Sequence, residues 1–283
     1  MVFYDEKGKA ALVTGAERGI GRGIAIRLAE AGYDVFFTYY YDKENALEVQ
    51  EKILSHGRKC CIYKANFKNQ EETCAVVKKA ASVLGRLDLV VNNAAVLEPI
   101  DYIFSLTPEQ IDTLTAINYR GYMIIMRDAI RYWIKTGTTG NIVNIASESS
   151  ICSHQKFSLY GGIKAAIMRS SENAALDAAP YGIRINCIMP GEIERDGLSE
   201  EDAAHREEFG KKVPISRQGT PRDVANAVLW LASNEATYVT GVNLTVDGGL
   251  VLTGMGDMNI GKDEVSCGFV IKKNISKEEM ETW

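Results

Sequence analysis

Two residues with complementary proton chemistry, Tyr160 and Lys164, lie four positions apart in the sequence. At this spacing two side chains share one face of a helix. A phenol has a pKa of about 10, and a neighbouring ammonium group lowers that pKa by stabilising the phenolate. Such a pair can exchange a proton with the oxygen of a substrate. An ordinary surface pair has the same spacing, so the two residues need support from elsewhere in the chain.

Ser147 supplies that support because it stands at the end of a predicted strand, thirteen residues before Tyr160. Substrates of open α/β sheets bind outside the carboxyl ends of the strands. A serine hydroxyl at that place can contact them, and Ser149 and Ser150 are weaker candidates for the same role.

A glycine-rich segment, Thr14–Gly21, is a second candidate site, with glycines at positions 15, 19 and 21. In a strand-to-helix turn, glycine permits the tight turn, the approach of backbone to a pyrophosphate, and close packing of helix on strand. The N-terminus of the helix then offers free N–H groups to the anion. A purely structural turn is the alternative, but the position in the first strand–helix unit predicts nucleotide binding.

The elements that must position these residues alternate regularly along the chain. Apolar runs rich in β-branched residues predict strands, and capped periodic patterns predict helices. The predicted strands cover residues 10–14, 34–40, 59–64, 87–92, 141–146, 184–189 and 242–246, and the predicted helices cover 21–31, 43–55, 70–84, 107–135, 158–178 and 220–232. This order predicts an α/β fold with a doubly wound, parallel, seven-stranded sheet of Rossmann type. We expect one dinucleotide-binding catalytic domain over residues 1–253 and a C-terminal extension over 254–283.

The motifs, taken together and in order, resemble those of the short-chain dehydrogenase/reductase family. The matching segments are Thr14–Gly21 (TGxxxGxG), Asn92–Ala95 (NNAG with alanine in the last place), Ser147, Tyr160–Lys164 (YxxxK), Pro190–Gly191 (PG) and Asp247–Gly249. The resemblance implies a set of four active residues. Ser147 would bind the substrate oxygen, Tyr160 would transfer the proton, and Lys164 would hold the nicotinamide ribose. Asn118, within the predicted helix 107–135, would keep a water in a proton relay, although an asparagine on a helix is most often a solvated residue.

The resemblance also implies a nicotinamide dinucleotide cofactor. The positions that match the family's cofactor contacts are Gly15, Arg18, Gly19, Ile20, Gly21, Tyr39, Tyr40, Asn66, Asn92, Ala94, Tyr160, Lys164, Pro190, Gly191 and Ile193. Among them, we expect Asn92 to tie neighbouring backbone groups together below the cofactor. We expect the Asn66 amide to accept a hydrogen bond near the adenine.

The choice between NADP and NAD depends on the end of the second predicted strand. NAD specificity usually needs a carboxylate there, but Tyr39 and Tyr40 occupy the place, and Asp42 is better placed to cap the next helix. Arg18, just before the second loop glycine, resembles a residue of NADP-preferring members, and its guanidinium can pair with a 2′-phosphate. We therefore expect NADP, with NAD as the alternative.

The substrate is less well defined by the sequence. The chain resembles the branch that contains glucose dehydrogenases and 3-oxoacyl reductases, which implies hydride transfer to or from a secondary alcohol or ketone of sugar, steroid, bile-acid or 3-oxoacyl type. Residues 96–105, 148–157 and 192–213 should form the substrate walls, and the acidic start of the last stretch fits poorly with a strongly anionic substrate. An epimerase or dehydratase with the same cofactor, or a cofactor-binding regulator without catalysis, are the alternatives.

Composition narrows the class of protein and its partners. A net charge of −5 argues against general nucleic-acid binding, and no apolar run reaches the roughly 18 residues of a membrane span. The six cysteines form no C-x-x-C pair and the three histidines have no metal spacing, so we assign no metal and expect free thiols in a reducing compartment. We expect a soluble cytoplasmic enzyme that acts on a small molecule. The family resemblance implies a homo-tetramer, paired through the helices that begin at Thr107 and Ser158.

Overall fold

Seven parallel strands form one sheet at the centre of the molecule. The computed structural model describes residues 6–196 and 208–253. The strands are β1 (Ala10–Val13), β2 (Asp34–Tyr39), β3 (Cys60–Lys64), β4 (Leu89–Asn92), β5 (Asn141–Ile145), β6 (Arg184–Pro190) and β7 (Asn243–Val246). Their order is β3-β2-β1-β4-β5-β6-β7, and each neighbouring pair is parallel. The predicted doubly wound α/β fold is confirmed.

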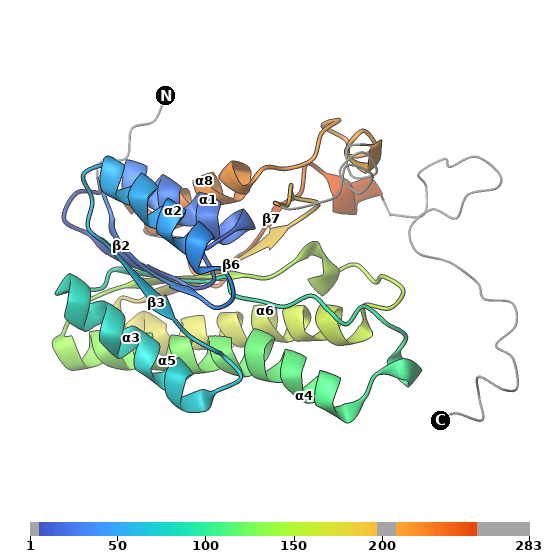
Figure 1. Ribbon diagram of the computed structural model, residues 1–283, viewed down its shortest axis with the longest axis horizontal. Coiled ribbons are helices and arrows are strands. Elements are labelled where there is room, and N and C mark those ends of the chain that lie inside the picture. Colours follow the sequence, from blue (N-terminus) through green and yellow to red (C-terminus); the bar gives the residue numbers. More distant parts are fainter. Residues whose placement is uncertain (1–5, 197–207, 254–283) are drawn as a thin grey trace, which may run out of the picture.

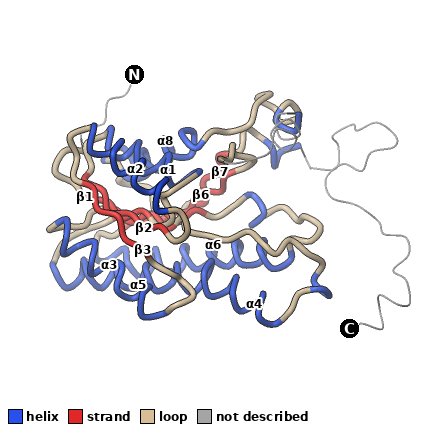
Figure 2. Tube along the Cα trace, viewed as in Figure 1, coloured by secondary structure: helices blue, strands red, loops and turns tan. Residues whose placement is uncertain are grey.

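Helices cover both faces of this sheet, as Figures 1 and 2 show. One layer contains α1 (Gly19–Glu30), α2 (Lys43–Ser55) and α8 (Pro221–Ala232), and the other contains α3 (Gln70–Leu84), α4 (Pro108–Thr115), α5 (Gly121–Thr136) and α6 (Ser158–Ala178). Both faces of the five inner strands are therefore buried, which explains their continuous apolar runs. No helix in residues 6–196 and 208–253 is long and apolar enough to span a bilayer.

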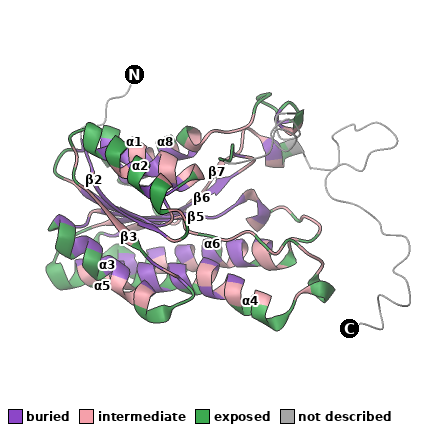
Figure 3. Cartoon of the chain, in the orientation of Figure 1, coloured by how far each residue is buried: buried purple, intermediate pink, exposed green. Residues whose placement is uncertain are grey.

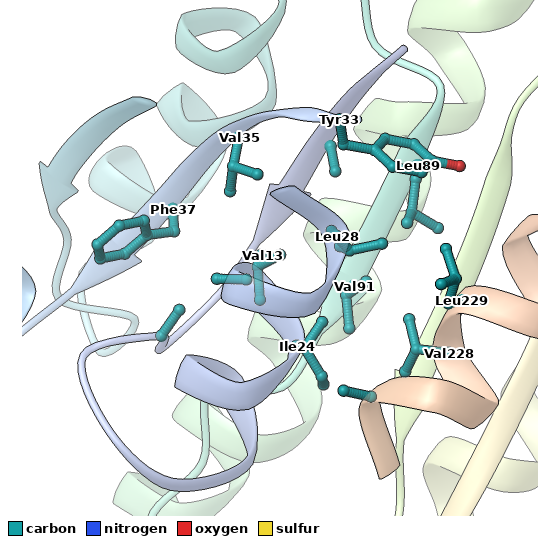
Figure 4. Close-up of a cluster of buried hydrophobic side chains, with 14 of the residues drawn as sticks. Val13, Ile24, Leu28, Tyr33, Val35, Phe37, Leu89, Val91, Val228 and Leu229 are labelled. Carbon is teal, nitrogen blue, oxygen red and sulfur yellow. The ribbon is translucent and has the colours of Figure 1, made fainter. Parts of the chain in front are cut away.

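The strands contribute alternate side chains to the two layers. Val13 and Val91 pack under α1 and α8 in one core, whereas Leu12 and Val90, one residue earlier, pack against the opposite layer. Figure 4 shows the first of these cores, where Val13 and Val91 lie close to Leu28 of α1. Figure 3 shows buried residues along the central strands and on the inner sides of the helices, whereas the edge strands β3 and β7 contain no fully buried residue. The alternation of side chains along a strand thus builds two cores from one sheet.

Local capping signals in the sequence are confirmed. Thr107 and Gln110 form the predicted capping box at the start of α4, with Pro108 in the first turn. The Asp42 side chain accepts a hydrogen bond from the Asn45 backbone N–H and caps α2. These contacts fix where the helices begin on the sheet.

The long helix predicted over residues 107–135 is interrupted in the structure. A π-helical turn, Ala116–Arg120, separates α4 from α5. The sequence pattern there is apolar at helical spacing, so it carries no signal for this change of hydrogen-bond register. The predicted C-terminal extension, residues 254–283, lies outside the described residues.

Candidate active site

Ser147, Tyr160 and Lys164 come together where β5 ends and α6 begins. Ser147 follows β5, while Tyr160 and Lys164 share one face of α6. The Ser147 hydroxyl is a hydrogen-bond partner of the Tyr160 phenol. Lys164 Nζ lies 5.6 Å from the centroid of the Tyr160 ring and donates a hydrogen bond of 2.8 Å to the carbonyl oxygen of Ile145. The fold therefore brings together the three residues that their spacing had singled out.

Burial shifts the pKa values of the two titratable side chains in opposite directions. Lys164 is buried, and the cost of holding a charge there lowers its pKa to about 7. Burial raises the pKa of Tyr160 to about 12, an effect that its hydrogen bond with Ser147 partly offsets. The charge of Glu148 raises the same pKa, and that of Arg195 lowers it. Near neutral pH the phenol is protonated and can donate to a substrate oxygen.

A chain of hydrogen bonds starts at Ser147 and ends at His154. Ser147 Oγ lies 3.2 Å from Ser149 Oγ, which lies 3.2 Å from Glu148 Oε1, and Glu148 Oε2 lies 2.8 Å from His154 Nε2. A carboxylate only accepts hydrogen bonds, so the Ser149 hydroxyl donates to Glu148 and the Ser147 hydroxyl donates to Ser149. The sequence singled out Ser149 only as a rival of Ser147, whereas the structure makes it the acceptor of the Ser147 proton.

Asn118 lies in the π-helical turn between α4 and α5. Its side chain is fully buried and pairs with the backbone of Val96: Oδ1 accepts from the N–H at 2.9 Å, and Nδ2 donates to the carbonyl at 2.6 Å. The alternative of a solvated helix residue is therefore wrong. The paired amide anchors the loop after β4 beside the active site, and π-helical turns of this kind are frequent at functional sites.

The glycine loop between β1 and α1 is closely packed. A Cβ at Gly21 would lie 2.1 Å from the carbonyl oxygen of Gly15, and a Cβ at Gly15 would lie 2.8 Å from Ala94 Cα. Ile20, in the first turn of α1, packs against the core below. The turn requires glycine at positions 15 and 21, as the sequence pattern predicts.

Gly19 presents its backbone N–H at the start of α1. Its φ is +53°, and a Cβ there would meet nothing within 4 Å. The N–H donates to Oδ2 of Asp196 at 2.9 Å, although the two residues are far apart in sequence. An anionic oxygen thus already binds at this helix N-terminus. The residues present therefore fit the pyrophosphate of a dinucleotide, whose oxygens would take the place of the carboxylate.

Asn93 hydrogen-bonds to the backbone of the glycine loop. We expected this role for Asn92, so the expectation for Asn92 is corrected. Asn93 Nδ2 donates to the carbonyl oxygens of Thr14 and Gly15 at 3.0 and 2.8 Å. Asn92, the last residue of β4, is fully buried and donates to Asn144 Oδ1 at 2.8 Å within the sheet. Neighbouring side chains on a strand point to opposite sides, so only one of the two asparagines can reach the loop.

An unexpected acid lies at the end of β2. Tyr39, the last residue of β2, is buried, and Tyr40, which follows it, is half-buried. Glu17, from the glycine loop, is also buried, and its Oε1 accepts a hydrogen bond from the Tyr40 backbone N–H at 3.3 Å. Arg18 is exposed. The sequence analysis missed Glu17, although an acid inside the glycine loop was a visible signal.

The other positions matched to cofactor contacts follow β3 and β6. Asn66 Oδ1 accepts from the backbone N–H of Lys68 at 3.0 Å, so this oxygen already has a partner within its own turn. Pro190 ends β6, and Ile193 is buried just beyond it. A Cβ at Gly191 would lie 2.7 Å from that of Asp247. The PG and Asp-Gly-Gly motifs, distant in sequence, therefore pack against each other.

A cavity of about 370 Å³ lies beside the start of α6, and Ser149, the hydrogen-bond partner of Ser147, is one of its lining residues. It is lined by residues 102–104 from the first expected substrate wall, by residues between 149 and 157 from the second, and by Ser158, Gly161 and Gly162 of α6. Tyr102 and Phe104 stack with ring centroids 5.1 Å apart, and Lys156 Nζ lies 5.0 Å from the Tyr102 ring centroid. Residues 197–207 of the third expected wall lie outside the described residues.

Comparison with known proteins gives consistent matches along most of the chain. A family model described as Enoyl-(Acyl carrier protein) reductase matches residues 15–251. The 3-oxoacyl-[acyl-carrier-protein] reductase FabG of Staphylococcus aureus is 33% identical over 244 residues, 86% of this chain and 98% of that protein. Glucose 1-dehydrogenase 2 of Bacillus subtilis is 33% identical over 254 residues, 89% of this chain and 98% of that protein.

Solved structures match a similar share of the chain. A short-chain dehydrogenase from Burkholderia cenocepacia J2315 in complex with NADP has a TM-score of 0.80 and 32% identity, over 86% of this chain and 98% of that one. The acetoin dehydrogenase YohF from Salmonella typhimurium has a TM-score of 0.79 and 28% identity, over 86% and 97%. The substrates in the names of FabG, the glucose dehydrogenase and the acetoin dehydrogenase differ, although each match covers 86–89% of this chain.

Proposed function

Because the chain belongs to the short-chain dehydrogenase/reductase family of NAD(P)-dependent oxidoreductases, we propose that it transfers a hydride between NADP(H) and a secondary alcohol or ketone. The observation that carries the proposal is the meeting of Ser147, Tyr160 and Lys164 at the carboxyl end of β5. Substrates of such sheets bind at that edge, and the glycine loop that fits a pyrophosphate lies at the same edge.

The nicotinamide, when bound, supplies or accepts the hydride, and the chain's own residues handle the proton. Tyr160 donates its proton to the substrate oxygen in reduction and takes it back in oxidation. Lys164, with a pKa of about 7, is poised to exchange protons near neutral pH, and in its charged form it stabilises the phenolate. Lys164 would also hold the ribose hydroxyls, and Asn118 supports the site through the loop after β4.

Ser147 holds the substrate oxygen beside Tyr160. Its proton is directed to Ser149 through the chain that ends at Glu148. Its oxygen is therefore ready to accept a hydrogen bond from an alcohol hydroxyl. A ketone oxygen needs a donor, so the Ser147 proton must turn away from Ser149 when a ketone binds. This reorientation is a small step because no covalent bond changes.

Arg18 supports NADP as the preferred cofactor. Its side chain is exposed next to Gly19, and no carboxylate of β2 itself stands at Tyr39 or Tyr40. A guanidinium pairs with phosphate through charge-assisted hydrogen bonds. The relative from Burkholderia cenocepacia was solved with NADP, which supports the same choice. Gly15, Gly21, Ala94, Pro190, Gly191 and Ile193 would line the rest of the cofactor site.

The substrate is proposed as a small molecule of sugar, steroid, bile-acid or 3-oxoacyl type. FabG of Staphylococcus aureus is named for an acyl-carrier-protein substrate and the Bacillus subtilis relative for glucose, so identity of about one third leaves the class open. A polar wall of Glu148 and His154 next to Ser147 favours substrates with hydroxyl groups near the reacting carbon over purely apolar ones.

The test is a panel of secondary alcohols and ketones, each with NADPH, NADP, NADH and NAD, followed by the absorbance of the reduced nicotinamide. We expect one cofactor oxidised or reduced for each substrate converted, with NADP(H) preferred. Turnover without net change in the cofactor would instead identify an epimerase or dehydratase. Binding of cofactor without any turnover would identify a regulator.

A homo-tetramer in the cytoplasm completes the proposal. Ile111 of α4, Met123 of α5 and Leu176 of α6 are exposed apolar side chains on the layer expected to pair between subunits. The five cysteines among the described residues are free thiols, which supports a reducing compartment. Light scattering at micromolar concentration measures the assembly directly, and a monomer there would contradict it.

A further inference from the structure

Glu17 closes the glycine loop against the end of β2. The backbone N–H groups of Gly15 and Ala16 donate to Thr38, to its hydroxyl at 3.1 Å and to its carbonyl at 3.0 Å. Glu17 continues this contact through its side chain, whose Oε1 accepts from the Tyr40 backbone N–H at 3.3 Å. The glutamate is only 7% exposed. A carboxylate is therefore held at the carboxyl end of the second strand, although it comes from the loop before α1.

This place has a defined chemical meaning in a dinucleotide-binding sheet. A carboxylate at the end of the second strand accepts a hydrogen bond from the 2′-hydroxyl of the adenosine ribose. Tyr39 and Tyr40 occupy the strand positions here. We propose that Glu17 binds the free 2′-hydroxyl of NAD(H) and opposes the 2′-phosphate of NADP(H). The proposal rests on the nicotinamide cofactor of the proposed function. It adds the residue that limits the preference of the enzyme for NADP(H) over NAD(H).

Glu17 and Arg18 then act in opposite directions from adjacent positions. A phosphate next to a buried carboxylate is repelled strongly, because like charges interact strongly where water is excluded. The exposed Arg18 attracts the same phosphate, but solvent and salt screen this attraction and weaken it. The ratio between the two cofactors is therefore a balance of two loop side chains, and NAD(H) remains a usable cofactor even though Arg18 favours NADP(H).

A purely structural role for Glu17 makes a different prediction. If Glu17 only ties the loop to β2, any acceptor of the same size would serve, and binding of both cofactors would change alike. Glu17→Gln keeps the length of the side chain and the oxygen that accepts from Tyr40, and it removes only the charge. This substitution therefore separates recognition from structural support.

The experiment measures dissociation constants by calorimetry for two adenosine fragments, 5′-ADP with a free 2′-hydroxyl and 2′,5′-ADP with a 2′-phosphate. The proteins are the wild type, Glu17→Gln, and the control Glu51→Gln, which makes the same charge change at an exposed position of α2. In Glu17→Gln we expect 2′,5′-ADP to bind about tenfold more tightly and 5′-ADP about threefold more weakly, since a charge-assisted hydrogen bond is roughly twice as strong as a neutral one. The control should change neither constant by more than about twofold, as befits an exposed charge.

Values of kcat/KM for NADPH and NADH, measured at one ionic strength, should shift in the same directions as the fragments. Equal shifts for both fragments in Glu17→Gln, or no shift, would overturn the proposal and leave the proposed function standing. Failure of both fragments to bind the wild-type protein would overturn the proposed cofactor site, and Glu17 with it.

Discussion

The two ends of the expected cofactor site are built in different ways. At the catalytic end, Lys164 and Asn118 are buried and each is bound to a backbone carbonyl. At the adenosine end, Arg18 is exposed, and the Gly19 N–H is bound by the exposed carboxylate of Asp196. The buried groups of the catalytic end are thus held by packing, whereas Arg18 and Asp196 at the other end are side chains at the surface.

This difference has an energetic consequence. Replacing a buried side chain changes the free energy of unfolding or the turnover, because it alters a desolvated charge or leaves a buried partner unpaired. A side chain at the surface interacts through screened charges, whose contributions are smaller. Substitutions at the catalytic end should therefore abolish turnover or change stability, and those at the adenosine end should change affinity and preference.

The largest effect is expected for Tyr160→Phe, which removes only the hydroxyl. General acid–base catalysis contributes roughly 10²- to 10⁴-fold, so kcat should fall by about that factor, while the affinity for NADPH stays nearly unchanged. Steady-state kinetics and fluorescence titration measure the two quantities. A kcat within about threefold of the wild type would remove Tyr160 from the catalytic role.

Lys164→Met tests how far the buried Lys164 charge lowers the free energy of unfolding. The pKa of Lys164 is lowered by burial to about 7 from an ordinary 10.5. Below pH 7 Lys164 is charged in both states, and the native protein bears the whole cost of burying that charge. Between pH 7 and 10.5 the unfolded chain holds one more proton than the native protein. The free energy of unfolding of the wild type therefore rises with pH there, by at most about 1.4 kcal/mol per pH unit. Methionine has no charge to bury, and the Ile145 carbonyl keeps the Tyr122 hydroxyl as a donor at 3.2 Å.

The free energy of unfolding of Lys164→Met, measured by denaturant titration without cofactor, should exceed that of the wild type most near pH 6. The difference between the two proteins should shrink steadily toward pH 10. A difference independent of pH would mean that the lysine is not charged and buried as the geometry indicates. Turnover should be lost at every pH.

Arg18→Ala should change only the binding of the 2′-phosphate of NADP(H). A charge-assisted hydrogen bond contributes about 1.5–3 kcal/mol, which corresponds to roughly a 10- to 150-fold rise in the KM for NADPH. The KM for NADH should stay almost the same. Equal changes for both cofactors would show that Arg18 does not bind the 2′-phosphate.

Asp196→Asn should produce the smallest change. The Asp196 carboxylate binds the Gly19 N–H that a pyrophosphate would use, so it competes with the cofactor. A charge near a helix N-terminus contributes about 0.3–1 kcal/mol, and its removal should tighten the binding of both NADPH and NADH by about two- to fivefold. Weaker binding in the variant would mean that Asp196 supports the cofactor site.

Much of the fold and of the catalytic set follows from short-range patterns in the sequence. The alternation of apolar runs with capped helices predicted the doubly wound sheet. The four-residue spacing of Tyr160 and Lys164 predicted that they share a helix face, and the strand end together with the family resemblance predicted Ser147 beside them. The glycines of Thr14–Gly21 likewise report a turn that admits no side chain at positions 15 and 21.

What the sequence by itself left open depends on contacts between distant segments. The choice of Asn93 over Asn92 was decided by the direction of side chains in β4. The position of Glu17 at β2, and of Asp196 at α1, arises because parallel strands bring all their carboxyl ends to one edge. Local pattern determines which elements form and which residues can react. Only the tertiary structure determines which charges meet, since that depends on packing between elements far apart in the chain.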